Sequence, residues 1–263
     1  MKKVCIVGMG WLGKELAVEL EKNKFSVTGT TSTVSKIDGL KQLSSNVELF
    51  ELGGPKNFIE GEFDFIIYTI PPSSNSDYAN LSCELIANMH KINPNAAWIY
   101  TSSTSVYGYT ERTVTEEIEV QPESESAKKI VEVEHCLQDN MSSSAILRLG
   151  GFVGGERHPV KYLAGKSNVS KPFAVVNLLH REDAVNAILF LTRNFQPGIY
   201  NLCSEDHPQK KEFFSGIAAR NNLLVIGFDE DDFTKDKVVT CNAMKKIGFE
   251  FKYTSPYDFP FEL

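Results

Sequence analysis

The chain has 263 residues, of which 42% are apolar, and this is enough to bury one large core, alone or with a smaller annex. Its formal net charge is −7 and no block of Lys or Arg occurs, which argues against a nucleic acid or an anionic membrane surface as the main partner. The expected partner is a small molecule.

The first half of the chain alternates strand and helix patterns. Residues 4–7 form a short β-branched run, and Leu12, Leu16 and Leu20 then recur every fourth residue, which places them on one helix face. A later helix is predicted over residues 78–92. Further strands are predicted at residues 25–31, 47–52, 63–70 and 96–103. This alternation predicts right-handed βαβ units and therefore an α/β fold with a doubly wound parallel sheet.

The second half of the chain has a looser rhythm that is punctuated by prolines. Helices are predicted over residues 126–138, 181–193 and 210–222, and strands over residues 144–151, 174–180 and 198–203. We therefore expect a core in residues 1–155 and a smaller α+β substrate lobe in residues 156–263, interleaved with the core.

Three glycines follow the first strand in the spacing G-x-G-x-x-G. Gly8 allows a tight turn, Gly10 lets a pyrophosphate approach the backbone, and Gly13 lets the helix pack closely on the strand. The helix begins at this turn, so the backbone amides near Trp11 and Leu12 are expected to bind phosphate. The core is thus predicted to bind a dinucleotide.

The end of the second strand indicates which dinucleotide is bound. NAD-specific domains usually place a carboxylate there for the ribose 2′-hydroxyl, but the first carboxylate here is Asp38, beyond the expected reach. The stretch offers a positive charge at Lys36. It also offers the hydroxyl side chains of Thr30, Thr31, Ser32 and Thr33. These features favour NADP over NAD, although no arginine stands ready for the 2′-phosphate.

Two further strand ends are expected at the same ligand-binding edge of the sheet. Thr69, Ile70 and Pro71 end the fourth strand and are predicted to line the cofactor cleft. Glu51 ends the third strand and is a candidate adenine contact.

Three stretches, YTSSTSVYG, ILRLGGFVGGERHP and VNLLHREDAVNAI, complete a pattern with the glycine turn. In this order the sequence resembles the atypical extended short-chain dehydrogenase/reductase family, the NAD(P)-dependent nucleotide-sugar epimerases and dehydratases. The resemblance implies a Rossmann core and hydride exchange at a nicotinamide, with a sugar or sugar nucleotide as substrate. By analogy it also implies a homodimer.

The resemblance assigns roles to two residues. Ser103, four residues before Tyr107, matches the serine that holds the reacting oxygen; the alternative is a strand-end serine that satisfies its own backbone. Lys128 matches the lysine that binds the nicotinamide ribose; the alternative is a solvated helix lysine.

The family's acid/base tyrosine has no counterpart. Its place, four residues before Lys128, is taken by Ser124, or by Ser126 if the register is shifted onto Pro122. No tyrosine occurs between Tyr109 and Tyr162. A serine hydroxyl cannot exchange a proton near neutrality without help. Tyr107 is therefore a candidate catalytic residue, with Tyr109 and Glu125 as further substitutes.

Arg148, in the sixth predicted strand, is expected to form a structural ion pair. Further along the chain, His180 and Asp183 resemble a family element that starts a helix. Asp183 is expected to favour the helix N-terminus, and His180 is not predicted to be catalytic.

The missing tyrosine leaves a second function open, that of an NAD(P)-binding redox sensor or scaffold without turnover. A third alternative is a two-domain hydroxyacid-type dehydrogenase, which uses the same glycine spacing. It needs a long helical second domain, and the prolines after residue 150 argue against one.

The cysteines and the N-terminus limit the setting of the protein. The five cysteines are far apart and contain no C-x-x-C pair, so neither a zinc site nor a disulfide framework is expected. The apolar stretch behind the first lysines ends at Gly8, too early for a signal peptide, and no run reaches transmembrane length. We therefore expect a cytoplasmic protein without a metal site.

Overall fold

The computed structural model describes residues 1–72 and 77–260. The chain divides into two compact units, each made of several segments. Unit 1 comprises Met1–Val106, Pro122–Arg148 and Val185–Tyr200. Unit 2 comprises Tyr107–Gln121, Leu149–Ala184 and Asn201–Leu263. The chain thus passes repeatedly between the units, and the predicted division near residue 155 stays a prediction.

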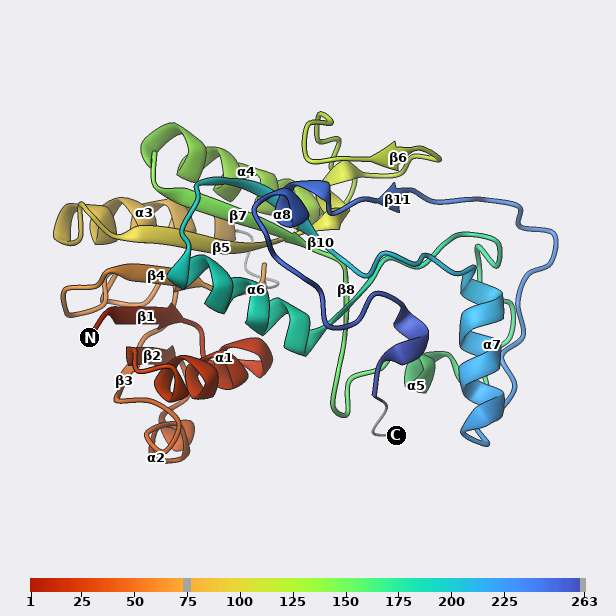
Figure 1. Cartoon of the computed structure of the whole chain (residues 1–263), viewed down its shortest axis with the longest axis horizontal. Coiled ribbons are helices and arrows are strands. Elements are labelled where there is room, and N and C mark those ends of the chain that lie inside the picture. Colours follow the sequence, from red (N-terminus) through yellow and green to blue (C-terminus); the bar gives the residue numbers. More distant parts are fainter. Residues whose placement is uncertain (73–76, 261–263) are drawn as a thin grey trace. The chain divides into compact units, whose positions relative to one another are not determined.

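A seven-stranded sheet organises unit 1 (Figure 1). Its strands are β1 (Lys3–Val7), β2 (Ser26–Thr31), β3 (Asn46–Leu49), β4 (Phe65–Tyr68), β5 (Ala97–Ser103), β7 (Ser144–Leu149) and β10 (Gly198–Leu202), in the order β10-β7-β5-β4-β1-β2-β3. The pairs β1–β2, β1–β4, β2–β3 and β4–β5 are all parallel. The four residues of β4 are all buried, as a parallel strand covered on both faces requires. This arrangement confirms the predicted doubly wound α/β fold.

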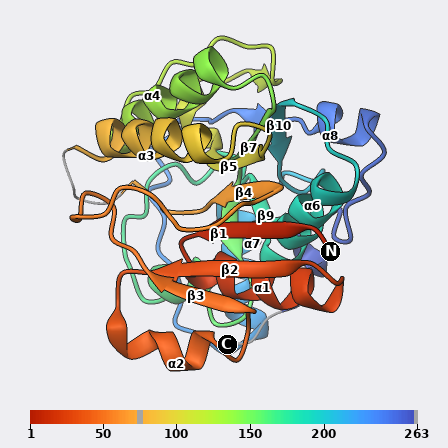
Figure 2. The ribbon, with the colours of Figure 1, turned by 90° about the vertical axis from the view of Figure 1, so that its left-hand side faces the viewer.

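Helices cover both faces of this sheet. They are α1 (Trp11–Lys22), α2 (Ile37–Leu40), α3 (Tyr78–Ile92), α4 (Glu125–Asn140) and α6 (Arg181–Arg193), whose residues from Val185 onward belong to unit 1; the 3-10 helix η1 spans Val34–Lys36. Figure 2 shows α3 and α4 side by side on one face and α1 on the other. Leu12, Leu16 and Leu20 are buried on the inner face of α1, as their spacing predicts.

A buried ion pair links α4 to β7. The Arg148 guanidinium donates to both carboxylate oxygens of Glu134, at 3.1 and 2.7 Å, and both side chains are almost fully buried. The Ser102 hydroxyl on β5 donates to the same carboxylate. This geometry confirms the structural ion pair expected for Arg148.

Unit 2 contains two small parallel strand pairs and short helices. The elements are β6 (Thr113–Val114) with β11 (Val238–Val239), β8 (Gly151–Val153) with β9 (Leu178–His180), α5 (Val160–Leu163), α7 (Lys210–Arg220), α8 (Asn242–Lys246) and the 3-10 helices η2 (Thr104–Tyr107), which begins in unit 1, and η3 (Pro256–Asp258). Phe213, Phe214 and Ile217 of α7 pack in its core. The helices described in unit 2 are short, unlike a long helical dehydrogenase domain. In the described residues of the whole chain, no helix has the length and apolar character needed to span a membrane.

The N-terminal part of α6 is anchored within unit 2. The Asp183 carboxylate accepts hydrogen bonds from the backbone N–H groups of Lys252 and Tyr253, at 2.7 and 3.1 Å. His180 lies beside it with its ring against Tyr253 and Phe259. Burial lowers the pKa of His180 and raises that of Asp183. These contacts hold the first residues of α6 against the segment that contains Lys252 and Tyr253.

Candidate nucleotide-binding site

The turn after β1 depends on the backbone of Gly8. Its φ is +107°, a conformation that L side chains rarely adopt. Its N–H donates to Thr30 Oγ1 at 2.8 Å, and its carbonyl accepts from Thr69 Oγ1 at 2.6 Å. The hydroxyl groups of Thr30 and Thr69, two predicted cofactor residues, therefore hold the turn between the ends of β2 and β4.

The other two glycines meet different constraints. A Cβ on Gly13 would lie 2.3 Å from the Gly8 carbonyl oxygen, so only glycine fits where α1 passes the turn. A Cβ on Gly10 would meet nothing within 4 Å, and no side chain caps the N-terminus of α1 at this residue. The backbone at Gly10 is thus open to a ligand, at the helix end that favours anions.

A cavity of about 560 Å³ opens beside this turn, at the carboxyl ends of β1 to β4. It is lined by Gly8, Met9, Gly10, Thr30, Thr31, Ser32, Thr33, Lys36, Phe50, Glu51, Leu52, Thr69, Ile70 and Pro71. This is the edge at which doubly wound sheets bind ligands, and the residues suit a dinucleotide in shape and polarity.

Most of the predicted cofactor residues meet in this cavity, but four do not line it. Trp11, Leu12 and Gly13 lie in the first turn of α1, and Lys128 lies on α4. The sequence prediction missed Met9, Phe50 and Leu52, which are wall residues without reactive groups. Phe50 and Leu52 could have been inferred from their positions on either side of Glu51. No comparable signal indicates Met9.

Two charged side chains lie at the cavity and differ in sign. Lys36, the last residue of η1, is exposed and follows the hydroxyl-bearing end of β2. Glu51 lies just beyond the end of β3. Asp38, on α2, is not among the residues that line the cavity.

Ser103 and Lys128 occupy other parts of unit 1. Ser103 ends β5 and its Oγ accepts from the N–H of Ser105 at 3.1 Å. Because β5 runs parallel to β4, Ser103 lies at the same edge of the sheet as Thr69. Lys128 is half exposed, and its Nζ lies 2.7 Å from Glu125 Oε1.

The position at which the resemblance to extended short-chain dehydrogenases would place a tyrosine has a structural use here. Ser124 is the N-cap of α4, and its Oγ accepts from the N–H of Ala127 at 3.1 Å. Tyr107, in unit 2, is 3% exposed, and its hydroxyl donates to Asn201 Oδ1 at 2.7 Å. Tyr109 donates to the carbonyl of Lys235. The hydroxyl groups of both tyrosines are therefore engaged within the protein.

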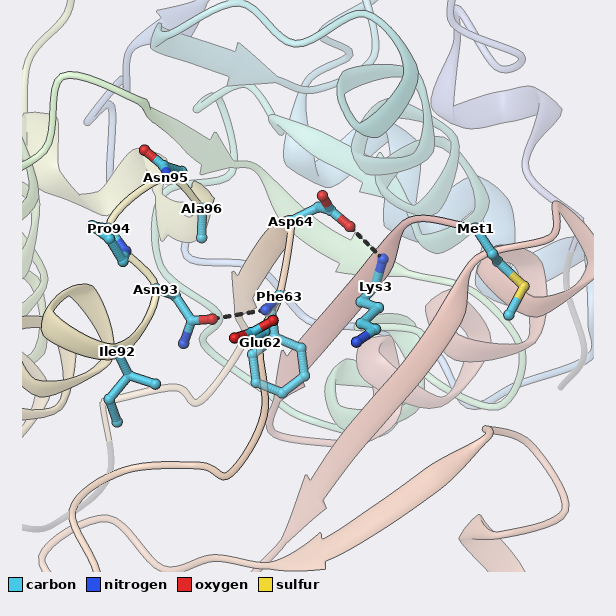
Figure 3. A pocket seen from close by; sticks show the side chains of 10 residues that line it. All are labelled: Met1, Lys3, Glu62, Phe63, Asp64, Ile92, Asn93, Pro94, Asn95 and Ala96. Atoms are coloured by element: carbon cyan, nitrogen blue, oxygen red, sulfur yellow. Dashed lines mark hydrogen bonds between the residues drawn. The ribbon is translucent and has the colours of Figure 1, made fainter.

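A second hollow, of about 460 Å³, lies at the opposite ends of β1 and β4 (Figure 3). Two hydrogen bonds join residues of its lining: Asp64 accepts from the N–H of Lys3, and Asn93 Oδ1 accepts from the N–H of Phe63, both at 2.7 Å. Ligands of doubly wound sheets bind at the carboxyl ends of strands, so this amino-terminal hollow is not the candidate site.

One comparison with known proteins concerns the segment that contains this cavity. Residues 3–120, which include the whole lining of the cavity, match the family described as the NAD binding domain of 6-phosphogluconate dehydrogenase. This segment is therefore an NAD-binding domain.

Two solved structures share the fold over nearly the whole chain. A UDP-glucuronic acid 4-epimerase from Bacillus cereus, in complex with NAD, has a TM-score of 0.75 at 14% identity, covering 92% of this chain and 91% of that chain. An ADP-L-glycero-D-manno-heptose-6-epimerase from Helicobacter pylori has a TM-score of 0.76 at 14% identity, covering 96% and 92%. At such identities the likeness shows the fold alone.

One relative is similar in sequence throughout. Protein YeeZ of Escherichia coli is 34% identical over 278 residues, and the match covers 100% of both chains. The chain therefore belongs to the family of protein YeeZ.

Proposed function

We propose that the protein is an NAD(P)-dependent oxidoreductase of the epimerase type that acts on a sugar or a sugar nucleotide. The observation that carries this proposal is the turn at Gly8, which opens the backbone of Gly10 to a cavity of about 560 Å³. The two epimerases described above act on nucleotide-linked sugars by their names, which supports the substrate class. The resemblance to extended short-chain dehydrogenases points the same way.

The preferred cofactor of this proposal is NADP. Lys36 at the cavity would pair with a 2′-phosphate, and the hydroxyls of Ser32 and Thr33 would donate to it. Glu51 also lines the cavity, just beyond the end of β3, where it would face the adenine. The bound nicotinamide would supply the group that accepts and returns hydride.

Ser103 would hold the reacting oxygen of the substrate, since it ends a strand at the ligand-binding edge. Lys128 would bind the nicotinamide ribose after its ammonium leaves Glu125. Tyr107 would have to release Asn201 before it could exchange a proton, so it is the weakest of the three proposed roles.

A second candidate function is nucleotide binding without turnover, as in a redox sensor or scaffold. It is favoured by the helix cap at Ser124, which stands where extended short-chain dehydrogenases have their acid/base tyrosine. In this case the cavity would still bind the dinucleotide, and no hydride would be exchanged.

One experiment separates the two functions. The purified chain is titrated with NADPH and with NADH by fluorescence, and then incubated with oxidised cofactor and a panel of sugar nucleotides while nicotinamide absorbance and products are followed. Turnover that falls at least tenfold in Ser103→Ala but not in the neighbouring Ser105→Ala supports the enzyme. Nucleotide binding without hydride exchange supports the second function, and absence of binding contradicts both.

A further inference from the structure

Two cysteines that are distant in the sequence meet inside unit 2. Cys203 directly follows β10, Cys241 directly precedes α8, and the end of β10 lies beside the start of α8 (Figures 1 and 2). Their sulfur atoms are 3.2 Å apart, and both residues are free thiols. The sulfurs of a disulfide are about 2.0 Å apart, so a movement of about 1 Å would bring this pair to bonding distance.

The backbone already holds the two cysteines side by side. The N–H of Cys203 donates to the Cys241 sulfur at 3.1 Å, and the side-chain amide of Asn201 donates to the carbonyl of Thr240 at 3.0 Å. Each segment is also bonded to a further strand, because the N–H of Ser204 donates to a carbonyl of β9 and the N–H of Thr240 donates to a carbonyl of β6. The sulfurs can therefore approach each other through side-chain rotation, without opening of the backbone.

The two thiols differ in exposure and in hydrogen bonding. Cys203 is fully buried, and its thiol donates to the carbonyl of Val239 at 3.2 Å. The hydrogen bond with Cys241 and burial both raise the pKa of Cys203. Cys241 is 6% exposed, and the N–H that its sulfur accepts would stay in place when the thiol loses its proton. Cys241 is therefore the thiol that a small oxidant meets first.

We propose that Cys203 and Cys241 form a reversible disulfide when the protein meets hydrogen peroxide, which makes the junction of β10 and α8 a site of oxidative modification. The Cys241 thiolate attacks the peroxide, so that the O–O bond breaks, an S–O bond forms, and hydroxide leaves and takes up a proton to become water. Cys203 then attacks this sulfenic sulfur; the S–S bond forms, the S–O bond breaks, and the Cys203 proton leaves with the oxygen as water. Two thiols lose two electrons and two protons, and one hydrogen peroxide becomes two waters.

The disulfide would close a loop between two positions that are 38 residues apart in the sequence. This loop contains α7, whose Phe213, Phe214 and Ile217 pack in the core of unit 2. A cross-link stabilises a fold mainly by restricting the unfolded chain, so the oxidised protein should resist unfolding better than the reduced protein. The cysteines do not line the cavity at the glycine turn, and the proposal does not depend on nucleotide binding.

The test uses the full reduced chain, freed of reductant and treated with hydrogen peroxide in its native state. Peptide mapping by mass spectrometry without reduction follows the tryptic peptides of residues 194–210 and 238–245, each of which contains one cysteine. We expect a cross-link between these peptides that disappears on addition of a dithiol reductant. We also expect the urea midpoint of unfolding to rise by about 0.5–1 M on oxidation and to return on reduction.

Three variants test the roles of the two thiols. Cys241→Ser is expected to lose both the cross-link and the rise in the urea midpoint, whereas Cys136→Ser, which changes a half-buried cysteine of unit 1, is expected to keep both. Cys203→Ala is expected to leave a sulfenic acid on Cys241, which is detected by quenching the reaction into urea that contains a cyclic dione. Far-UV circular dichroism of the reduced proteins checks that each variant is folded.

The peptide map of the parent protein decides the proposal even where a variant fails to fold. Absence of the cross-link between Cys203 and Cys241 in the native protein would overturn it, as would a cross-link that forms only in urea. Faster cross-linking of either cysteine to a different one, or an equal rise of the urea midpoint in Cys241→Ser, would overturn it as well.

Discussion

The carbonyl oxygen of Gly8 occupies the space in which residue 13 would carry a side chain: a Cβ on Gly13 would lie 2.3 Å from it. Real Cβ atoms do not approach backbone atoms this closely, so α1 can pack against the turn only because residue 13 has no side chain. The position of the phosphate-binding end of α1 therefore depends on this contact.

Gly13→Ala is expected to lower both stability and nucleotide affinity. The added methyl must push α1 away from the turn, and overpacking of this kind costs about 1–3 kcal/mol of unfolding free energy. Urea unfolding and NADPH titration measure the two effects. Gly39→Ala is the matched control, because a Cβ on Gly39 meets nothing within 4 Å and its φ is not positive. Equal effects of the two substitutions would contradict the close packing.

Gly10→Ala is expected to separate binding from stability. The φ of −82° suits any residue and the surrounding space is empty, so the unfolding free energy should change by less than about 1 kcal/mol. The methyl group would nevertheless stand where the backbone faces the cavity, and NADPH affinity should fall about tenfold or more. Unchanged affinity would show that the nucleotide does not approach this residue.

Lys36→Ala is expected to weaken NADPH binding about tenfold and to leave NADH binding unchanged. Only NADPH carries the 2′-phosphate that Lys36 would pair with, and a charge-assisted hydrogen bond is worth about 1.5–3 kcal/mol before solvent screening. Lys41→Ala serves as control, since Lys41 is an exposed lysine nearby that does not line the cavity. A parallel loss of both cofactors would argue against 2′-phosphate recognition.

Arg148→Met is expected to cost about 3–5 kcal/mol of unfolding free energy, because it leaves the buried Glu134 carboxylate without its partner. The double variant Arg148→Met/Glu134→Gln should be more stable than the single one, since Gln removes the charge and keeps an oxygen for Ser102. The exposed pair Lys22 and Glu19 offers the control: Lys22→Met should change stability by less than about 1 kcal/mol. Urea denaturation of all three variants measures the difference.

The predictable part of the fold is the part whose periodicity is strong. The helix over residues 78–92 is predicted correctly from the sequence because its apolar residues keep helical spacing over four turns. The strand pair β6 and β11 was missed because each strand has two residues and exists only through pairing with a distant segment. The strand predicted over residues 174–180 is confined to Leu178–His180, where pairing with β8 begins.

The candidate site divides in the same way. Gly8 and Thr30 could be found in the sequence because the glycine spacing of a nucleotide-binding turn, and the position of polar side chains at the end of the second strand, are both known. Met9 could not, because its side chain packs over Gly29, a contact that only the folded turn creates.

His158 is expected to make stability depend on pH in acid. It is 1% exposed, lies against Phe213 and Phe214, and accepts the N–H of Val160 with Nδ1 at 3.1 Å, which requires the neutral ring. Burial, helped by the charge of Lys161, lowers its pKa from 6.5 to about 4. Between pH 6.5 and about pH 4, His158 binds a proton in the unfolded chain but stays neutral in the folded chain. The free energy of unfolding therefore falls as the pH falls.

The contribution of His158 is thus complete above about pH 6.5 and is lost progressively down to about pH 4, on the order of 2 kcal/mol after screening. His158→Gln keeps a hydrogen-bond acceptor but cannot titrate, so its unfolding free energy should decline less over this range. Urea unfolding at about pH 7, 5.5 and 4.5 measures the slope, with the exposed His135→Gln as control. Because His180 and His207 also have pKa values lowered by burial, a residual decline is expected in the His158 variant. Equal slopes in the parent and in His158→Gln would mean that the folded protein accepts the proton on His158 as readily as the unfolded chain does.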